Sequence, residues 1–306
     1  MKNFKLKYFV TTIWLIVFGL ILAGCRIEIP KSDNLTNAPT REITDDLGRR
    51  VQIPAQIKRA VSLAPNLTEI VFSVGAGDKL VGVTSFCNYP QETQKIPKIG
   101  DTISPNIETI IALKPQIVLV STSSQIENFT KTLDAQNIAY FVTNPQTLDD
   151  IYKSIHQIGD IVGKKEKADE IVGTLKKRVA DVEARTNAAD DVRVFMQFSK
   201  DSLFTIGKDS YMTDLINRAG GISVTKDVVT AYPQLSKETA LALNPEAIIL
   251  SDSEDNQSPN DAFKNSPAVK NNKIFKINAD IISRPAPRII DALEQIAKSL
   301  HPKSFE

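Results

Sequence analysis

Short apolar runs alternate with amphipathic helical stretches along two long parts of the chain. In the first part, these patterns predict strands at 60–63, 80–83, 117–120 and 138–142 and helices at 67–74, 107–113 and 126–137. The second part repeats the alternation, with strands at 192–198, 203–206, 248–250 and 274–277 and helices at 212–219, 237–243 and 289–300. Strands that alternate with helices are typical of parallel βαβ units. The pattern therefore predicts an α/β fold that occurs twice.

A long helical region separates these two parts, with predicted helices at 148–162 and 164–186. An apolar stripe with helical spacing runs along the second helix: Ile171, Leu175, Val179 and Val182. At 1.5 Å per residue this helix is roughly 30–35 Å long, about the diameter of a small lobe. A coiled-coil partner is an alternative, but few heptads are present. We interpret 148–187 as a helical segment, including an interlobe helix, between an N-terminal α/β lobe at 44–147 and a C-terminal α/β lobe at 188–306.

One segment occurs in similar form in both parts. Residues 108–115 combine a glutamate, a short amphipathic helix and a proline ahead of a strand, and residues 238–245 do the same 130 positions further on. The repeats of solenoid proteins are shorter, about 20 to 50 residues. The long spacing therefore indicates two similar lobes, and a cleft between lobes is a common place for ligand binding.

The N-terminus carries an export signal. Lysines at 2, 5 and 7 precede an apolar run over 8–22, which leads into Leu-Ala-Gly-Cys at 22–25. This arrangement resembles the signal of bacterial lipoproteins, which implies that residues 1–24 are removed and that Cys25 receives a diacylglycerol on its sulfur. An uncleaved membrane anchor is the alternative, because the run is near the lower limit of about 17 to 25 residues for a span. Residues 25–43 are expected to form a flexible tether.

Charge and cysteine content narrow the possible classes. The formal net charge is +1, and it becomes about −2 without residues 1–24, which hold three lysines and no acids. A nucleic-acid-binding surface is therefore not indicated. The sequence contains two cysteines, so Cys87 has no intrachain partner once Cys25 is lipidated. We interpret Cys87 as a small, partly buried residue.

Catalytic chemistry is difficult to place in this sequence. The two histidines, His156 and His301, stand at no spacing that would pair them, and the common nucleophile, nucleotide and zinc motifs are missing. We therefore assign no catalytic residue. The imidazole and thiolate set that holds a bare transition metal is also missing. We expect no resident cofactor and no direct metal site, so that iron or cobalt would enter only inside a chelator.

Several blocks of the mature chain resemble one family. They are Val-Ser-Leu-Ala-Pro-Asn-Leu-Thr-Glu-Ile at 61–70, Gly-Ala-Gly-Asp-Lys-Leu-Val-Gly-Val-Thr at 75–84, Asn-Tyr-Pro at 88–90, Lys-Ile-Pro-Lys-Ile-Gly at 95–100, Pro-Asn-Ile-Glu at 105–108, Ala-Leu-Lys-Pro at 112–115 and Arg-Pro-Ala-Pro-Arg at 284–288. Together they are similar to periplasmic substrate-binding proteins of ABC importers for cobalamin, haem and ferric siderophores.

The resemblance implies a fold, a partner and a location. The fold is two Rossmann-like α/β lobes joined by a single long α-helix, with modest closure on ligand binding. The implied partner is an ABC importer permease with its ATPase, and the implied location is the extracytoplasmic (periplasmic) side of a membrane, where lipidated Cys25 anchors the protein. We further expect a monomer that binds a small-molecule metal chelate and no nucleic acid.

Glu108 and Glu238 match two glutamates of this family, one on each lobe, that dock onto arginines of the permease. A simpler interpretation is that each is an acid in the first turn of a helix, which is worth about 0.3 to 1 kcal/mol with the helix dipole. Asn106 and Ser236 precede them as good N-caps. Both interpretations can hold together, and the duplicated position favours docking.

Ligand-contacting residues are expected where strands end, because open α/β sheets bind ligands outside their carboxyl edge. The candidates are Asn66, Phe86, Tyr89 and Ser121 from the first lobe and Phe198, Phe204, Tyr232, Asp280 and Arg284 from the second. By resemblance to the cobalamin-binding member, Phe86 and Tyr232 would press on a macrocycle, and Asp280 and Arg284 would hydrogen-bond amide groups. Phe198 could instead be a core residue, and Asn66 could cap a helix with Glu69 completing a capping box.

Among metal chelates, the surrounding motifs favour a corrinoid such as cobalamin. The tryptophans that the cobalamin-binding member places around the corrin are missing, since Trp14 leaves with the signal. A catecholate siderophore would require clustered cations, for which Arg284, Lys200 and Arg288 are candidates. Haem would require an axial ligand such as Tyr89 or Tyr232. Two further classes stay open: an extracytoplasmic enzyme acting on a chelate, and a sensor or scaffold with the same fold.

Overall fold

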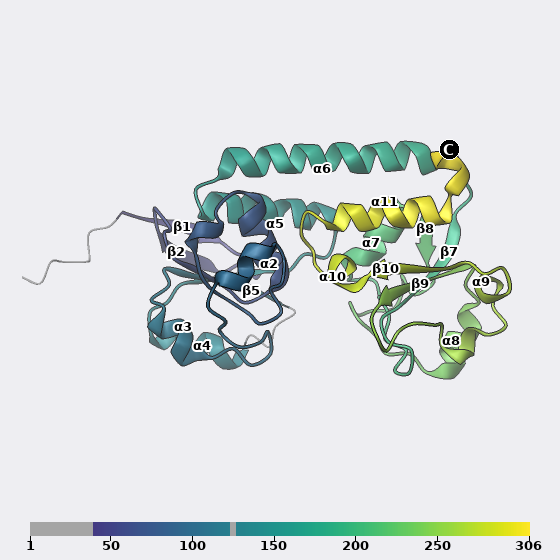
Figure 1. The fold of residues 1–306 in the computed structure, drawn as a ribbon, viewed down its shortest axis with the longest axis horizontal. Coiled ribbons are helices and arrows are strands. Elements are labelled where there is room, and N and C mark those ends of the chain that lie inside the picture. The colour runs from purple at the N-terminus through teal and green to yellow at the C-terminus, as the bar shows by residue number, and fades with distance from the viewer. Residues whose placement is uncertain (1–38, 123–126) are drawn as a thin grey trace, which may run out of the picture. The chain divides into compact units, whose positions relative to one another are not determined.

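Two parallel sheets of four strands each organise the part of the chain that the structure describes. The computed structural model describes residues 39–122 and 127–306, and Thr40–Glu306 form one unit (Figure 1). The strand order is β4-β3-β5-β6 in the first sheet and, read in the same sense, β8-β7-β9-β10 in the second. The bounds are β3 Ala60–Ser62, β4 Leu80–Val83, β5 Ile117–Ser121, β6 Tyr140–Thr143, β7 Val192–Gln197, β8 Gly221–Ser223, β9 Ala247–Asp252 and β10 Ile274–Asn278. The two halves thus share one topology, and the expected α/β class with two Rossmann-like lobes is confirmed.

Helices connect the strands in both halves. The α-helices are α2 Pro65–Ser73, α3 Ile107–Ala112, α4 Glu127–Ala135, α5 Leu148–Ile161, α6 Lys165–Thr186, α7 Tyr211–Arg218, α8 Lys237–Leu243, α9 Pro267–Lys270, α10 Ala279–Ile282 and α11 Ile289–Leu300. Short 3-10 turns are η2 Gly77–Lys79, η3 Gln91–Lys95, η4 Asp261–Phe263 and η5 Pro302–Phe305. None of the helices within residues 39–122 and 127–306 combines the length and the apolar character needed to cross a membrane.

The long helix α6 bridges the two halves. It has 22 residues, so it is about 33 Å long at 1.5 Å per residue. Its buried stripe includes Val172, Leu175, Val179 and Val182. It packs against α5 beside the first half and against α11 beside the second, and Figure 1 shows it running above both halves. The expectation of a single long connecting helix is confirmed.

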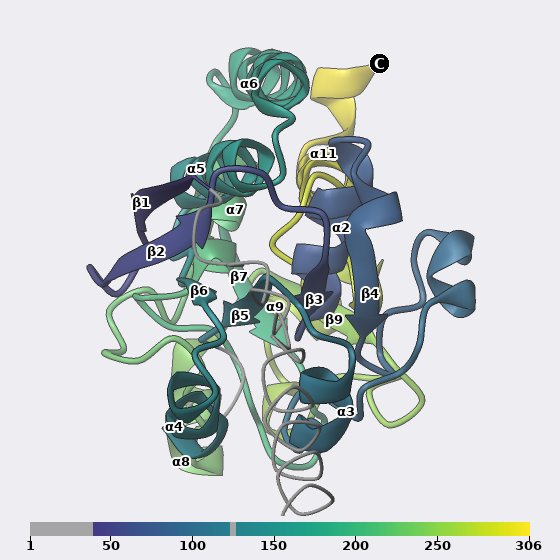
Figure 2. The same cartoon turned by 90° about the vertical axis from the view of Figure 1, so that its left-hand side faces the viewer.

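The two faces of each sheet pack against different cores. Ile117 and Leu119 of β5 belong to a large core that extends through both halves, whereas Val118 and Val120 belong to a smaller core with Ile110 of α3. The same alternation occurs in β9, whose buried residues Ile248 and Leu250 pack with Ala240 of α8. Since strand side chains alternate between faces, α3 and α8 cover equivalent faces of the two sheets. Figures 1 and 2 show both helices on the side of the unit away from α6.

The predicted strand at 203–206 is wrong. Leu203 has a φ of 48°, which is a left-handed conformation incompatible with a strand, and Phe204 makes only an isolated bridge to Gln234. The edge of the sheet is instead formed by β8, which follows Gly220. This glycine has a φ of 79° and ends α7 in a left-handed conformation. The strand β8 was not predicted, because it has only three residues and begins with a glycine.

An antiparallel hairpin precedes the first sheet and was not predicted. It consists of β1 Thr40–Thr44 and β2 Arg50–Pro54, so residues 40–43, assigned to the tether, are in fact strand. Asp46 accepts a hydrogen bond of 2.8 Å from the backbone N–H of Asn144, which joins the hairpin to the segment after β6. The predicted signal, the expected lipidation site Cys25 and residues 26–38 of the predicted tether lie outside the described residues.

Candidate functional site

A cavity of about 800 Å³ lies between the two halves at the carboxyl ends of their strands. Its volume is within the range of about 300 to 1,000 Å³ that small-molecule sites occupy. The first half contributes Ala64, Pro65, Asn66, Ser85, Phe86, Asn88, Thr102, Ser121, Thr122, Asn144, Pro145 and Gln146. The second half contributes Asp209, Tyr211, Ala231, Tyr232, Asp280, Ser283, Arg284 and Pro285. The cavity therefore occupies the place that the strand topology predicts.

Six of the nine expected ligand-contacting residues line this cavity: Asn66, Phe86, Ser121, Tyr232, Asp280 and Arg284. The other three, all aromatic, lie elsewhere. Tyr89 stacks under Arg288, with the guanidinium carbon 3.8 Å from the ring centroid. Phe198 is partly buried against the large core and meets Tyr232 edge-on at 6.2 Å. Phe204 is exposed next to its bridge with Gln234.

Asn66 has a different role from the alternative of a helix cap. The helix α2 begins at Pro65 with Ala64 as its N-cap, and no side chain caps it. Proline fits this first helical position because its missing N–H would have no partner there. Asn66 thus lies inside the first turn and lines the cavity. The alternative of a capping box is thus excluded, because Glu69 binds arginines of the other half instead.

The aromatic residues of the cavity leave ring surface open. Phe86 is 55% exposed and Tyr232 is 48% exposed, although large apolar side chains are usually buried. The Tyr232 hydroxyl is near Ser210 and Tyr211, and burial of this end raises the pKa of Tyr232. Burial also raises the pKa of Tyr211 well above its usual range, and the Tyr211 hydroxyl donates to the carbonyl oxygen of Ile282 at 3.0 Å. Both phenols are therefore neutral near physiological pH.

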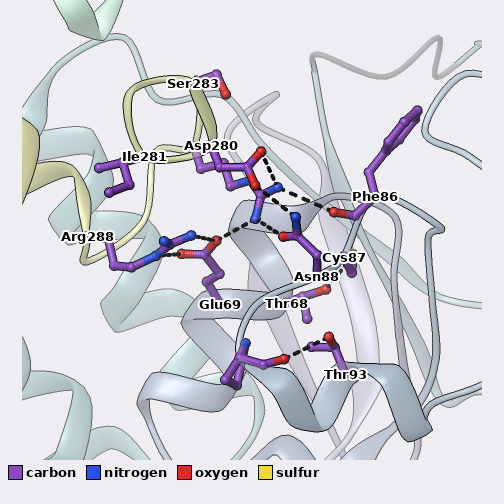
Figure 3. A network of polar contacts seen from close by, with 12 residues as sticks. Thr68, Glu69, Phe86, Cys87, Asn88, Thr93, Asp280, Ile281, Ser283 and Arg288 are labelled. Atoms are coloured by element: carbon purple, nitrogen blue, oxygen red, sulfur yellow. Dashed lines mark hydrogen bonds and ion pairs between the residues drawn. The ribbon is translucent and has the colours of Figure 1, made fainter. Parts of the chain in front are cut away.

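A buried ionic network joins the two halves beside the cavity (Figure 3). Its centre is Glu69 of α2, whose side chain is 2% exposed. Arg284 donates from Nη1 to Glu69 Oε1 at 3.0 Å, and Arg288 donates from Nε to Glu69 Oε2 at 2.9 Å. Hydrogen bonding to Glu69 is the largest cause that raises the pKa of Arg288. One carboxylate of the first half thus binds two guanidinium groups of the second.

The same network extends to the wall of the cavity. Arg284 donates to Asn88 Oδ1 at 2.7 Å and lies 2.7 Å from Asp280 Oδ1, while Asn88 Nδ2 donates to Asp280 Oδ2 at 2.8 Å. Arg284 and Asp280 line the cavity as expected, but they are bound to each other. Arg288 is held by Glu69, and Lys200 is not among the lining residues. This interlobe network was not predicted from the sequence, although Asn88 is part of one of the family-like blocks.

Glu108 and Glu238 occupy matching exposed positions in the first turns of α3 and α8. Both expected caps are confirmed: Asn106 Oδ1 accepts from the N–H of Thr109 at 2.9 Å, and Ser236 Oγ accepts from the N–H of Thr239 at 3.1 Å. Hydrogen bonds from its own backbone N–H and from Ser236 lower the pKa of Glu238. The structure therefore gives each half one exposed acid in the first turn of a capped helix, on the side away from α6.

Two further features of the described residues bear on ligand chemistry. Cys87 is buried, and its sulfur lies 3.2 Å from the hydroxyl oxygens of both Thr68 and Thr84. Within residues 39–122 and 127–306, His, Cys, Asp and Glu side chains form no group of three suited to a metal ion.

An α/β unit with two topologically equivalent halves, a bridging helix and a cavity between the halves defines a bilobal substrate-binding protein. The family model described as "Periplasmic binding protein" matches residues 61–281, and the chain belongs to this family. The resemblance found in the sequence is thus confirmed. Proteins of this family are substrate-binding components of transport systems, which implies a permease partner and a small-molecule ligand.

Three relatives show how similar the chain is to characterised and uncharacterised proteins. It is 32% identical to the uncharacterized ABC transporter substrate-binding lipoprotein YvrC of Bacillus subtilis, over 96% of this chain and 98% of that one. It is 28% identical to the vitamin B12-binding protein of Vibrio parahaemolyticus, over 79% and 89% of the two chains. Among solved structures, the vitamin B12-binding protein BtuF of Vibrio cholerae is 26% identical with a TM-score of 0.71, over 83% of this chain and 100% of that one.

A fourth comparison shows that the fold alone does not specify the ligand. The molybdate-binding protein MolA of Haemophilus influenzae is also 26% identical, with a TM-score of 0.73 over 87% of this chain and 92% of that one. A corrinoid and a small oxyanion are thus named for relatives at equal identity. The chemistry of the cavity must therefore decide which ligand is proposed.

Proposed function

We propose that this chain is the extracytoplasmic solute-binding component of an ABC importer and that its cavity captures a corrinoid such as cobalamin without altering it. The observation that carries this proposal is the set of uncharged hydrogen-bonding groups in the lining of the cavity. Asn66, Asn144 and Gln146 supply amides, and Ser85, Thr102, Thr122 and Ser283 supply hydroxyls. Such groups suit the amide side chains of a corrin, and the open rings of Phe86 and Tyr232 suit its flat macrocycle.

The charges of the cavity favour a corrinoid over an anionic chelate. Among the described lining residues Arg284 is the one cation, and it is already bound to Glu69 and Asp280. Asp209 adds a second carboxylate to the lining. Anionic catecholates are recognised by clusters of guanidinium groups that are free to bind them. The raised pKa of Tyr232 also disfavours the phenolate that would bind haem iron.

Delivery to the permease is assigned to Glu108 and Glu238. Each is exposed in a matching place on one half, and a permease built from two equivalent halves would require one acid from each. Glu108→Ala combined with Glu238→Ala is expected to leave ligand affinity unchanged and to abolish transport. Loss of ligand binding with normal docking would contradict this assignment.

The remaining parts of the proposal concern location and class. Removal of residues 1–24 and lipidation of Cys25 would hold the protein on the outer side of a membrane, since two acyl chains anchor a protein stably. We propose a monomer without catalytic activity, because the two lobes of one chain already form a complete site. The YvrC relative, named a lipoprotein, supports the anchor.

A binding comparison tests the proposal. Purified residues 26–306 are mixed with cyanocobalamin, haemin or a ferric catecholate siderophore and then separated from free ligand by gel filtration. Coloured co-elution with cyanocobalamin alone is expected. Phe86→Ala and Tyr232→Ala should weaken it, whereas Phe204→Ala, an exposed aromatic outside the cavity, should not. Co-elution of haemin or of the siderophore, without cyanocobalamin, would show that the ligand is not a corrinoid. Progressive release of free metal would indicate an enzyme.

A further inference from the structure

The two helices that carry Glu108 and Glu238 are too short to be stable without support from the rest of the fold. The helix α3 has six residues and α8 has seven, whereas isolated helices below about 12 residues are marginal in water. Within two residues of its end, each helix is followed by a residue in the left-handed conformation and then by proline. These residues are Lys114, with a φ of 46°, and Asn244, with a φ of 44°. Both helices therefore end abruptly, and contacts with other parts of the chain must fix the direction of their axes.

In each half an arginine from a central strand region binds the carboxyl end of this helix. Arg59 directly precedes β3, and its Nε donates to the carbonyl oxygens of Leu113 at 3.1 Å and Lys114 at 3.3 Å. Arg193 belongs to β7, and its Nη2 donates to the carbonyl oxygen of Leu243. The last carbonyl groups of a helix have no partner within the helix, and a cation is favourable at this end of the dipole.

A second set of bonds fixes each arginine in place. Gln116 Oε1 accepts from the backbone N–H of Arg59 at 3.0 Å, and Glu246 Oε2 accepts from the backbone N–H of Arg193 at 2.9 Å. The backbone N–H groups of Gln116 and Glu246 donate back to the carbonyl oxygens of these arginines at 2.9 and 2.8 Å. We call each set an arginine clamp: Arg59 with Gln116, and Arg193 with Glu246. The clamps are equivalent because β3 and β7 hold the same place in their sheets.

We infer that Arg59 and Arg193 are positioning residues for docking to the permease. Each fixes one end of a helix whose other end presents Glu108 or Glu238. This inference rests on the docking role proposed above. Two acids can engage one permease together only if their separation is correct, and a preformed geometry lowers the ordering cost of binding. Neither arginine lines the cavity, so docking and ligand binding are separable.

The test measures docking of the lipidated full chain to its host's ABC importer in lipid nanodiscs. Because a favourable charge at a helix end is worth about 0.3 to 1 kcal/mol, Arg59→Ala or Arg193→Ala should weaken docking about two- to fivefold. Arg59→Lys should restore part of the loss, since lysine can still donate to a carbonyl. Arg185→Ala, which removes an exposed arginine stacked near Phe305, should change nothing. Affinity for cyanocobalamin should stay unchanged in all of these variants.

Double variants distinguish positioning from a general loss of structure. In a Glu108→Ala background, Arg59→Ala should have no further effect on docking, whereas Arg193→Ala should keep its full effect. Hydrogen exchange should quicken at α3 amides in Arg59→Ala and at α8 amides in Arg193→Ala. Normal docking by both arginine variants, or an equal Arg59→Ala loss with and without Glu108, would overturn the inference. Normal docking by the Glu108→Ala, Glu238→Ala protein would instead refute the docking role itself.

Discussion

Replacing Glu69 tests whether the buried interlobe network holds the two halves together. Glu69→Ala removes a carboxylate that is bound by both Arg284 and Arg288. The side chain of Arg284 is 8% exposed and that of Arg288 is 21% exposed. The variant therefore leaves two guanidinium groups close together, largely out of water and without their shared counter-ion. Asp280 still binds Arg284, so the loss is greatest at Arg288.

The expected cost follows from the burial of the network. Removing one member of a buried ion pair typically costs about 3 to 5 kcal/mol, because the remaining charge stays desolvated. For a unit of this size each kcal/mol lowers the melting temperature by about 2 to 4 °C. The melting temperature of Glu69→Ala should thus fall by roughly 6 to 20 °C. Glu69→Gln, which keeps the shape and loses the charge, should fall within the same range.

Urea denaturation and calorimetry of the mature chain provide the measurement. Glu170→Ala is the matched control, since Glu170 forms an exposed pair with Lys167 at 2.7 Å and such pairs contribute about 0 to 1 kcal/mol. In a double-mutant cycle, Glu69→Ala and Arg288→Ala should together cost less than the sum of their separate effects. If Glu69→Ala destabilises no more than Glu170→Ala, the network does not hold the halves together.

Three other outcomes are expected. In Gly207→Ala the new Cβ would overlap the Thr230 carbonyl oxygen and lie 2.6 Å from the Val228 carbonyl oxygen. The loop bearing Tyr232 should therefore shift, with a loss of about 1 to 3 kcal/mol in stability and weaker cyanocobalamin binding. The control is Gly173→Ala in α6, whose new Cβ meets nothing within 4 Å and which should be neutral or stabilising in the same assays. Tyr152→Phe should not lower the unfolding free energy, because the Tyr152 hydroxyl has no hydrogen-bond partner among the described residues and an unsatisfied buried group is costly. A clear decrease in the unfolding free energy measured by urea denaturation would contradict this expectation. Burial raises the pKa of Tyr152 to about 12. The unfolded chain therefore loses this proton at a lower pH than the folded chain, and the unfolding free energy should fall as pH rises from about 10 to 12. In denaturation measurements across this pH range, the unfolding free energy of Tyr152→Phe should fall less than that of the unsubstituted protein.

Local patterns predicted most of the secondary structure because each signal lies within a few residues. The run of Ile117 to Val120 is apolar on both faces, as expected for a strand with cores on both sides, and every residue of β5 is buried. The N-caps Asn106 and Ser236 could also be predicted from the sequence, since each directly precedes its helix. The pocket candidates at strand ends followed from topology, which brings the carboxyl edges of two sheets together.

The failures have non-local causes. Leu203 has a strand-like sequence around it, but its left-handed backbone results from the turn that precedes Phe204 and the bridge to Gln234. Glu69 and Arg284 are 215 residues apart, so no window of sequence contains their pairing. The helix-cap interpretation of Glu69 agreed with its neighbours in sequence. In the structure, however, Glu69 forms ion pairs with the distant arginines Arg284 and Arg288. Arg59 and Arg193 belong to no recognisable motif. Their role can be inferred only from the carbonyl groups that they bind in the structure.

Equilibrium dialysis of the lipid-free mature chain against cyanocobalamin is the decisive experiment for the proposed ligand. We expect saturable binding of one cyanocobalamin per chain, loss of that binding in Phe86→Ala with Tyr232→Ala, and release of the ligand with an unchanged absorption spectrum on unfolding. No saturable binding, or release of a ligand with an altered spectrum, would contradict the claim that the cavity captures a corrinoid and delivers it unchanged.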